Sequence, residues 1–152
     1  MTTIQENPQP LPLIGQSVGQ AQASLTRLLA GILAESGTSH QTWLGLQRLN
    51  ALGGQLARDA YERDVSDWLQ LDAPAAAQVA SNLVAVGLAE TDGDAIRITA
   101  AGRGLRADVL TASAKVTGPV LAAVDRADLE TTIRTLDEIT RRVRETFGTE
   151  ES

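Results

Sequence analysis

The segment that most constrains the fold is residues 88–99, LAETDGDAIRIT, because the apolar pattern changes its period there. Ile96 and Ile98 are two positions apart, so on a strand they share one side while Arg97 lies on the other. The pair Asp92–Gly93 is a strong signal for a two-residue turn between antiparallel strands. The segment therefore predicts a β-hairpin within a chain that is otherwise patterned as helices.

Elsewhere, apolar residues recur every three to four positions, which is the pattern of amphipathic helices. Glycines separate these segments, and Ser, Thr or Asp residues stand where they can cap the helix starts. Pro119 predicts a bend or interruption in the fifth helix, and prolines at positions 8, 10 and 12 predict an extended N-terminal arm over residues 1–13. The expected helices cover about residues 15–35, 40–52, 59–70, 73–86, 100–124 and 125–148.

The composition excludes several kinds of site. The chain has no cysteine, which excludes disulfides, thiolate nucleophiles and sulfur-ligated metals. Aromatic residues make up only 3% of the chain, so Leu, Val, Ile and Ala must fill the core, which suits helix packing. No P-loop, serine-hydrolase or zinc-protease motif occurs, and we expect no catalytic activity, no cofactor and no metal. Without a signal peptide or an apolar span of roughly 20 residues, we expect a cytoplasmic protein with no membrane partner.

The last helix carries an apolar seam with the four–three spacing of a coiled coil. The seam consists of Leu129, Ile133, Leu136, Thr140, Val143 and Phe147. The first helix also has an apolar stripe, and a small central domain cannot cover both. We expect a second, two-fold-related copy of the chain to cover them; packing of the first helix on the last within one chain is the alternative. This organisation predicts dimerisation helices at residues 14–36 and 125–148, flanking a winged helix-turn-helix domain with a long connecting helix at residues 37–124.

Three segments carry a resemblance to a known family: VSDWLQLDAPAAAQVASNLVAVGLAE for a helix-turn-helix, IRITAAGRGL for the second wing strand and the helix after it, and AVDRADLETTIRTLDEITRRV for a C-terminal helix. In this order and spacing, the chain resembles the MarR family of transcriptional regulators over about residues 14–147. The resemblance implies a mainly α fold with a small β-hairpin wing and an obligate homodimer formed by the terminal helices. It also implies binding to a pseudo-palindromic DNA operator and release by a small, often aromatic or anionic, effector.

The expected recognition helix, APAAAQVASNLVAVGL, has no lysine or arginine. Relatives commonly carry arginine at the positions that fall here on Gln78 and Asn82. If Val79, Leu83 and Val86 point inward, the residues that face away from the core are Ala75, Gln78, Ser81 and Asn82. Gln and Asn can bond adenine in a bidentate manner, and Ala can pack on a thymine methyl group. The alternative is a plain alanine-rich helix whose polar residues only face solvent.

Positive charge must then come from arginines outside this helix, because phosphate neutralisation supplies most of the affinity for DNA. Arg48, Arg58 and Arg63 precede the helix, and Arg97, Arg103 and Arg106 follow it. We assign Arg97, Arg103 and Arg106 as candidate phosphate ligands, with a salt bridge from Arg103 to Asp67 or Asp108 as the alternative. The wing tip, TDGD, is short and acidic, which argues against contact with a minor groove.

An effector in the cleft between the dimerisation helices and the winged domain would meet the second helix. His40, Trp43 and Arg48 are the candidate ligand-binding residues there, with Trp43 able to stack on an aromatic compound. The alternative places Trp43 in the core and His40 at a helix start without a ligand. Two functions follow from the sequence: a ligand-responsive, DNA-binding regulator, or a MarR-like module that binds a ligand or a protein and no longer binds DNA.

Overall fold

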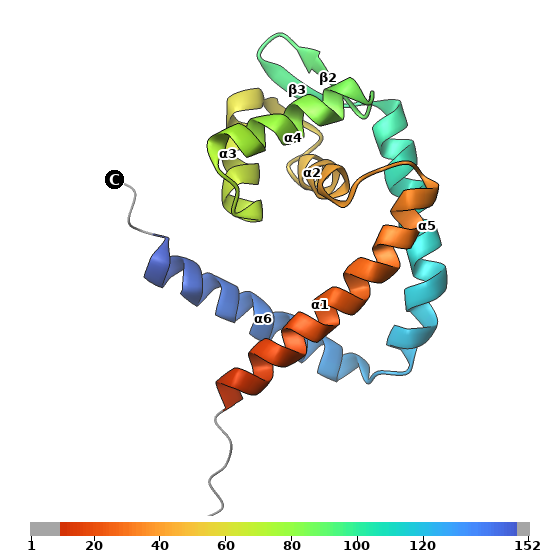
Figure 1. Ribbon diagram of the computed structural model, residues 1–152, viewed down its shortest axis with the longest axis vertical. Helices are drawn as coiled ribbons and strands as arrows, with labels where there is room; N and C mark the ends of the chain where they lie inside the picture. Colours follow the sequence, from red (N-terminus) through yellow and green to blue (C-terminus); the bar gives the residue numbers. More distant parts are fainter. Residues whose placement is uncertain (1–9, 149–152) are drawn as a thin grey trace, which may run out of the picture. The chain divides into compact units, whose positions relative to one another are not determined.

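The computed structural model describes residues 10–148, which form six helices and three short strands (Figure 1). The elements are α1 (Pro10–Glu35), α2 (His40–Ala51), β1 (Gln55–Ala57), α3 (Arg58–Leu69), α4 (Ala73–Ala85), β2 (Ala89–Asp92), β3 (Ala95–Ile98), α5 (Ala100–Ala122) and α6 (Arg126–Phe147). The chain divides into two compact units, one up to Ala112 and one from Ser113 onward. The first contains the helix-turn-helix and the hairpin, and we call it the winged-helix unit. The second consists of the end of α5 and α6.

Side chains cap the starts of four helices, as the sequence predicts. The backbone N–H groups of Thr42, Ala75, Gly102 and Asp128 donate to side-chain oxygens at 2.9–3.1 Å. The capping residues are Ser39 for α2, Asp72 for α4, Thr99 for α5 and Asp125 for α6. Each bond satisfies a backbone donor that has no partner inside the helix, so these boundaries depend on local chemistry.

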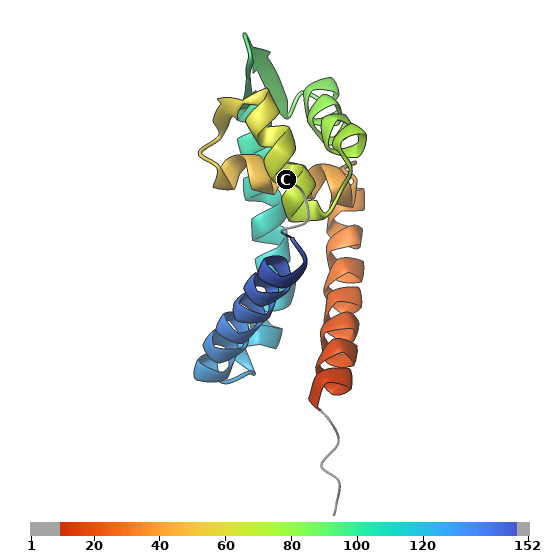
Figure 2. The same cartoon turned by 90° about the vertical axis from the view of Figure 1, so that its left-hand side faces the viewer.

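The three strands form an antiparallel sheet in the order β1-β3-β2. The predicted hairpin is confirmed, and both views show it projecting beyond the helices of the winged-helix unit (Figures 1 and 2). Its turn lies one residue later than predicted, because Asp92 pairs with Ala95 and leaves Gly93 and Asp94 as the loop. Gly93 has φ = 58°, a conformation that glycine adopts without strain. Strand β1 was not predicted from the sequence, since its three residues are too few to show a period.

Two expectations about the helices are wrong, and a third is wrong in part. Helix α1 begins at Pro10, so residues 10–13 are not part of an extended arm; residues 1–9 lie outside the described part of the chain. Prolines are compatible with a first turn, whose N–H groups have no partner inside the helix. Helix α5 continues through Pro119, so the interruption is wrong and the bend stays a prediction. Val86 is 61% exposed instead of pointing inward, because α4 ends at Ala85 and the chain turns at Gly87 (φ = 78°).

The core of the winged-helix unit lies among α2, α3, α4 and the sheet, with contributions from α1 and α5. Its buried apolar residues are Leu33, Trp43, Leu46, Leu49, Tyr61, Val65, Ala76, Val79, Ala80, Leu83, Leu88, Ala89, Ile96, Ile98 and Val109. Leu, Val, Ile and Ala dominate this list, as the composition predicts. Ile96 and Ile98 share the buried side of β3, which confirms the alternation that predicted the hairpin.

The Tyr61 hydroxyl donates to the backbone carbonyl of Gly45 at 2.7 Å and is buried in this core. Burial raises the pKa of the phenol, with a smaller contribution from Asp64, so the group stays a neutral donor. We expect Tyr61→Phe to lower the free energy of unfolding by about 1 kcal/mol, because the bond is lost while the ring still fills its space. Urea denaturation measures the change, and an unchanged midpoint would show that the bond contributes nothing net.

Within residues 10–148, no single helix is long and apolar enough to cross a membrane; α5 and α6 meet the length and composition criteria only as a bent pair.

Candidate nucleic-acid interface

Helix α4 packs on the core with one face, and its opposite face is accessible to solvent. Ala76, Val79, Ala80 and Leu83 are buried against α2, α3 and the sheet. On the other side, Gln78 is exposed, whereas Ala75, Ser81 and Asn82 are half-buried. The structure therefore places all four predicted DNA-contacting residues away from the deepest part of the core.

The polar side chains of this face already bond to one another. The Gln78 Nε2 group donates to Asn82 Oδ1 at 2.8 Å, one turn along the helix. In this arrangement Gln78 keeps its oxygen as an acceptor and Asn82 keeps its amide N–H groups as donors. The pair offers an acceptor and donors side by side, which are the complementary groups for an adenine edge.

Arg58 lies against α4. Its Nη2 donates to Ser81 Oγ at 2.9 Å, and its Nε pairs with Glu62 at 2.9 Å. Its backbone N–H donates to the carbonyl of Asp94 at 2.8 Å, so this residue joins α3, α4 and the hairpin loop. Arg58 is one of the flanking arginines in the sequence, but it is not among the residues predicted for the site. Its contact with Ser81 spans 23 positions, and no local pattern signals it.

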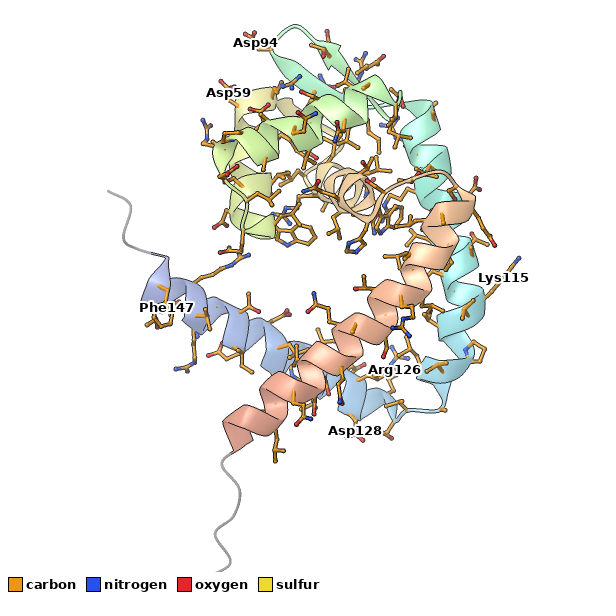
Figure 3. All side chains as sticks on the ribbon, in the orientation of Figure 1. Asp59, Asp94, Lys115, Arg126, Asp128 and Phe147 are labelled. Carbon is orange, nitrogen blue, oxygen red and sulfur yellow. The ribbon has the colours of Figure 1, made fainter. Side chains whose placement is uncertain are left out.

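Arg97 is held by acidic residues of the wing. Its guanidinium donates to Glu90 at 2.6 Å and to Asp92 at 3.2 Å. The hydrogen bond and charge of Glu90 raise the pKa of Arg97, with a smaller contribution from Asp92. With Asp94 in the loop of the hairpin (Figure 3), residues 89–98 carry three carboxylates and one guanidinium. The wing is therefore acidic even where it carries its arginine.

Arg103 and Arg106 lie one turn apart on α5 but have different surroundings. Arg106 is half-buried and donates to Gln47 at 2.7 Å, which ties α5 to α2. Arg103 is exposed, and among residues 10–148 it forms no ion pair or side-chain hydrogen bond. The alternative partners Asp67 and Asp108 do not pair with it. Of the three predicted phosphate ligands, Arg103 is the one whose guanidinium has no hydrogen-bond partner among residues 10–148, whereas Arg97 is paired with carboxylates and Arg106 donates to a neutral amide.

The three predicted ligand-binding residues have different surroundings within the winged-helix unit, and their role in binding a ligand stays a prediction. Trp43 is 4% exposed and belongs to the core, and His40 is the first residue of α2. Arg48 donates to Asp64 through Nε and through Nη2, the latter at 3.0 Å, and its Cζ lies 5.4 Å from the ring centroid of Trp68. Hydrogen bonding to Asp64 raises the pKa of Arg48. These contacts tie α2 to α3 and occupy the guanidinium.

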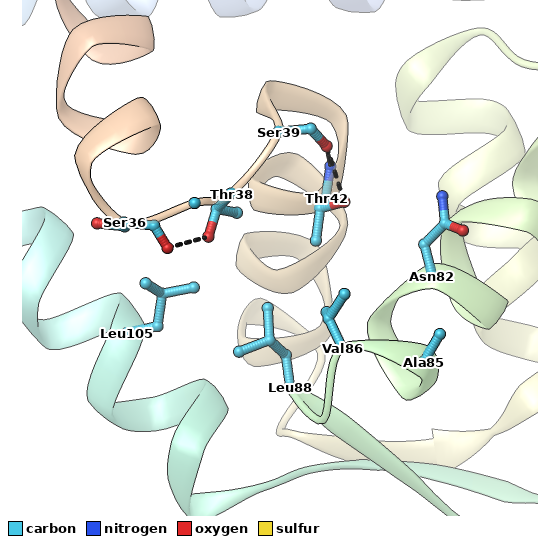
Figure 4. Close-up of a pocket in the computed structure, with 10 residues that line it drawn as sticks. Ser36, Thr38, Ser39, Thr42, Asn82, Ala85, Val86, Leu88 and Leu105 are labelled. Carbon is cyan, nitrogen blue, oxygen red and sulfur yellow. Dashed lines mark hydrogen bonds between the residues drawn. The ribbon is translucent and has the colours of Figure 1, made fainter.

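A pocket of about 410 Å³ lies between the α1–α2 turn, the end of α4 and the start of α5 (Figure 4). The lining residues are Ser36, Gly37, Thr38, Ser39, Thr42, Asn82, Ala85, Val86, Leu88 and Leu105. We call this space the α4 pocket. None of His40, Trp43 and Arg48 lines it, whereas Asn82 does. The pocket could not be predicted from the sequence because its walls come from three separate segments.

In the second unit, α6 has one apolar face and one charged face. Every residue predicted for the dimer seam except Leu129 is exposed in the single chain, up to 76% for Phe147 (Figure 3). Leu129 is half-buried, and Ile139, which the prediction omitted, is 39% exposed. The hydroxyl of Thr140 donates to the carbonyl of Leu136 at 2.9 Å, so the polar member of the seam is satisfied within its own helix.

The charged face of α6 is organised around Glu138, which pairs with Arg141 at 2.6 Å and with Arg142 at 2.7 Å. These two guanidinium groups lower the pKa of Glu138 to about 2. Arg141 also contacts Glu145, so the carboxylates and guanidinium groups form a connected surface network. A helix with this network on one side and an exposed apolar stripe on the other is typical of a partner-binding helix.

Within the described residues, no group of three or more His, Cys, Asp and Glu side chains is placed to hold a metal ion.

Comparison with known proteins identifies the fold. No family model matches the sequence, and no curated protein matches it significantly. The structure is similar to the ligand-free organohalide-sensing RdhR-CbdbA1625 transcriptional regulator, with a TM-score of 0.76, 16% identity and coverage of 98% of this chain and 90% of that one. It is also similar to NadR in complex with 4-hydroxyphenylacetate (TM-score 0.71, 18% identity, 88% and 98% covered). A third similar structure is that of a MarR family protein from Bacillus stearothermophilus, with a TM-score of 0.71, 16% identity and coverage of 90% of this chain and 97% of that one. The chain has the winged-helix fold of MarR-type regulators.

Proposed function

We propose that the chain is a homodimeric transcriptional regulator that binds duplex DNA through α4 and responds to a small molecule in the cytoplasm. The observation that carries the proposal is the exposed polar face of α4 on a MarR-type winged-helix fold. Gln78 and Asn82 can bond to base edges, and Ala75 can pack on a thymine methyl group. The proposed half-site therefore contains A·T pairs. No catalytic function is proposed.

Phosphate contacts would come from arginines beside α4 and on α5. Arg103 is exposed without an acidic partner among the described residues. Arg58 lies against Ser81 and can contribute if it exchanges Glu62 for a phosphate. Arg106 can contribute if it exchanges Gln47 for a phosphate. With a net charge of −6 and an acidic wing, the dimer would make only about four to six phosphate contacts, which gives modest affinity and a shallow salt dependence.

The proposed dimer uses α6, whose apolar stripe is exposed in the single chain. Burying such a stripe against the same stripe of a second copy removes apolar area from water on both chains. The effector proposal is supported by the neighbours: NadR has been solved with 4-hydroxyphenylacetate, and RdhR-CbdbA1625 with 2,4-dichlorophenol.

One observation favours a second function. Arg97, the arginine of the wing, is matched by Glu90 and Asp92, and the wing carries a net negative charge that DNA repels. A MarR-type module that binds a ligand or a protein partner and has lost DNA binding would tolerate this arrangement. The two functions predict opposite results in a direct binding measurement.

Fluorescence anisotropy with a labelled duplex from the region upstream of the gene, at about 50 mM and about 200 mM salt, separates the two functions. The regulator is expected to bind this duplex more tightly than a scrambled duplex of equal composition, and more weakly at the higher salt. Equal binding to both duplexes, or no binding at the lower salt, would favour the module without DNA binding.

Substitutions in the same assay distinguish phosphate contacts from base contacts. We expect Arg103→Ala to weaken binding to all duplexes by about tenfold and to reduce the salt slope by about 2 per dimer, because one phosphate contact is lost in each copy. Gln78→Ala and Asn82→Ala should instead lower the preference for particular base pairs, by about 1–3 kcal/mol at each. Arg126→Ala, on α6, serves as the matched arginine control. If the three test variants behave like this control, the proposed docking through α4 is wrong.

A further inference from the structure

The α4 pocket joins hydrogen-bonding and apolar walls. Hydroxyl groups of the α1–α2 turn and the first turn of α2 form one wall, and Asn82 stands across the pocket from Thr42 (Figure 4). Val86, Leu88 and Leu105 supply the apolar part. A volume of about 410 Å³ is within the range of small-molecule sites in proteins.

Two donors in this lining are left for a ligand. The Thr42 hydroxyl accepts from Ser39 Oγ at 2.8 Å, and its own proton has no acceptor among residues 10–148. Asn82 uses its Oδ1 to accept from Gln78, which leaves both amide N–H groups of its side chain for another acceptor. The hydroxyl protons of Ser36 and Thr38 are instead directed to the carbonyls of Ile32 and Ser36 at 3.4 Å.

The lining contains no charged side chain. The carboxyl ends of α1 and α4 border the pocket, where carbonyl dipoles disfavour a negative charge. The amino end of α2 also borders it, but the N–H of Thr42 already donates to Ser39. An anion that entered would lose its hydration without gaining a cation, which is costly.

We infer that the α4 pocket binds an uncharged small molecule with an apolar body and a carbonyl-type acceptor. The Thr42 hydroxyl and the Asn82 amide donate to the acceptor, and the body packs on Val86, Leu88 and Leu105. This ligand class differs from the anionic effectors that the resemblance allows. Binding holds the Asn82 amide toward the pocket and away from bases, so the ligand competes with DNA for the same side chain. That last step rests on the proposed function, whereas ligand binding does not.

Two probes of nearly equal size test the ligand class: benzamide, which is neutral, and benzoate, which is anionic at pH 7. Titration of the full-length chain, labelled in Leu and Val methyl groups and side-chain amides, is followed by NMR without DNA. We expect benzamide to shift the signals of Val86, Leu88, Leu105 and Asn82 with a Kd of about 1 mM, as befits a ligand of about nine heavy atoms. Benzoate is expected to bind at least about tenfold more weakly.

Variants locate the site. Asn82→Asp keeps the shape but removes the donors and adds a negative charge, so it should weaken benzamide binding by about tenfold or more. Ala85→Trp places a large ring at the pocket and should block binding. Ala73→Trp, exposed at the start of the same helix and outside the lining, is the matched control and should leave the Kd unchanged. Equal binding of the two probes, shifts centred on other residues, or no shift up to about 10 mM would overturn the inference.

Measuring DNA binding with and without benzamide distinguishes ligand binding at the α4 pocket from the proposed regulatory function. If the chain binds DNA, saturating benzamide should raise the Kd for the upstream duplex, and Ala85→Trp should abolish this effect. If benzamide binds at the α4 pocket but the chain binds no DNA, the site stands and the regulator proposal fails. If DNA binding is specific but the pocket signals do not shift, the regulator proposal stands and the site fails.

Discussion

Gly102→Ala is expected to lower the free energy of unfolding by about 3 kcal/mol, because the added methyl group has no space. An added Cβ would lie 2.3 Å from the carbonyl oxygen of Leu88 and 2.8 Å from Cγ1 of Ile98. Neither atom can move cheaply, because the Leu88 carbonyl accepts the N–H of Thr99 and Ile98 is buried in the sheet. Urea denaturation followed by tryptophan fluorescence measures the loss.

Gly104→Ala is the matched control for this effect. It lies two residues further along α5, and an added Cβ would meet nothing within 4 Å. Alanine forms helix better than glycine by about 1 kcal/mol, so this substitution should raise the free energy of unfolding. Opposite signs for the two substitutions would confirm that Gly102 is needed for the close approach of α5 to the sheet. If Gly102→Ala were as stabilising as the control, the packing described here would be wrong.

The second large effect concerns association. We expect the double substitution Leu136→Glu and Val143→Glu to abolish the proposed dimer, because it would place four carboxylates in an apolar interface. The side chains of Leu136 and Val143 are 38% and 51% exposed in the single chain. The molar mass measured by light scattering should fall from twice the chain mass of 16.0 kDa to the mass of a single chain. Circular dichroism of the same sample shows whether the monomer stays folded.

Thr131→Glu serves as the control on α6, since it adds a carboxylate about half a turn away from the seam. It should leave the mass unchanged. A wild-type chain that is monomeric at micromolar concentration, or a double variant that remains dimeric, would contradict dimerisation through this stripe. An unfolded double variant would agree with it, because many obligate dimers have no stable monomer.

The helices and their starts could be predicted because they depend on neighbours in the sequence. The spacing of apolar residues gives the helical face, and Ser39, Asp72, Thr99 and Asp125 each bond to a backbone group three residues away. The winged-helix order followed from these elements and from one hairpin signal. Local chemistry was therefore enough for the fold class.

The site was less predictable, because its contacts join distant positions. Arg58 meets Ser81 across 23 residues, and Arg106 meets Gln47 across 59. Strand β1 exists only through its pairing with β3, and the α4 pocket needs the end of α4 to face the α1–α2 turn. The exposure of Val86 follows from the place where the helix ends, which a periodic pattern does not fix.

The most direct test of the account is selection of bound sequences from a random duplex library by the full-length chain. A two-fold dimer that docks α4 in successive major grooves should enrich an inverted repeat with A·T pairs in each half-site. The half-site centres should be about 10 base pairs apart, or a multiple of that distance. Enrichment of such a repeat, lost in the Leu136→Glu and Val143→Glu double variant, is the predicted result. No enrichment, or enrichment of a single unrepeated site, would contradict a two-fold dimer that binds specific DNA.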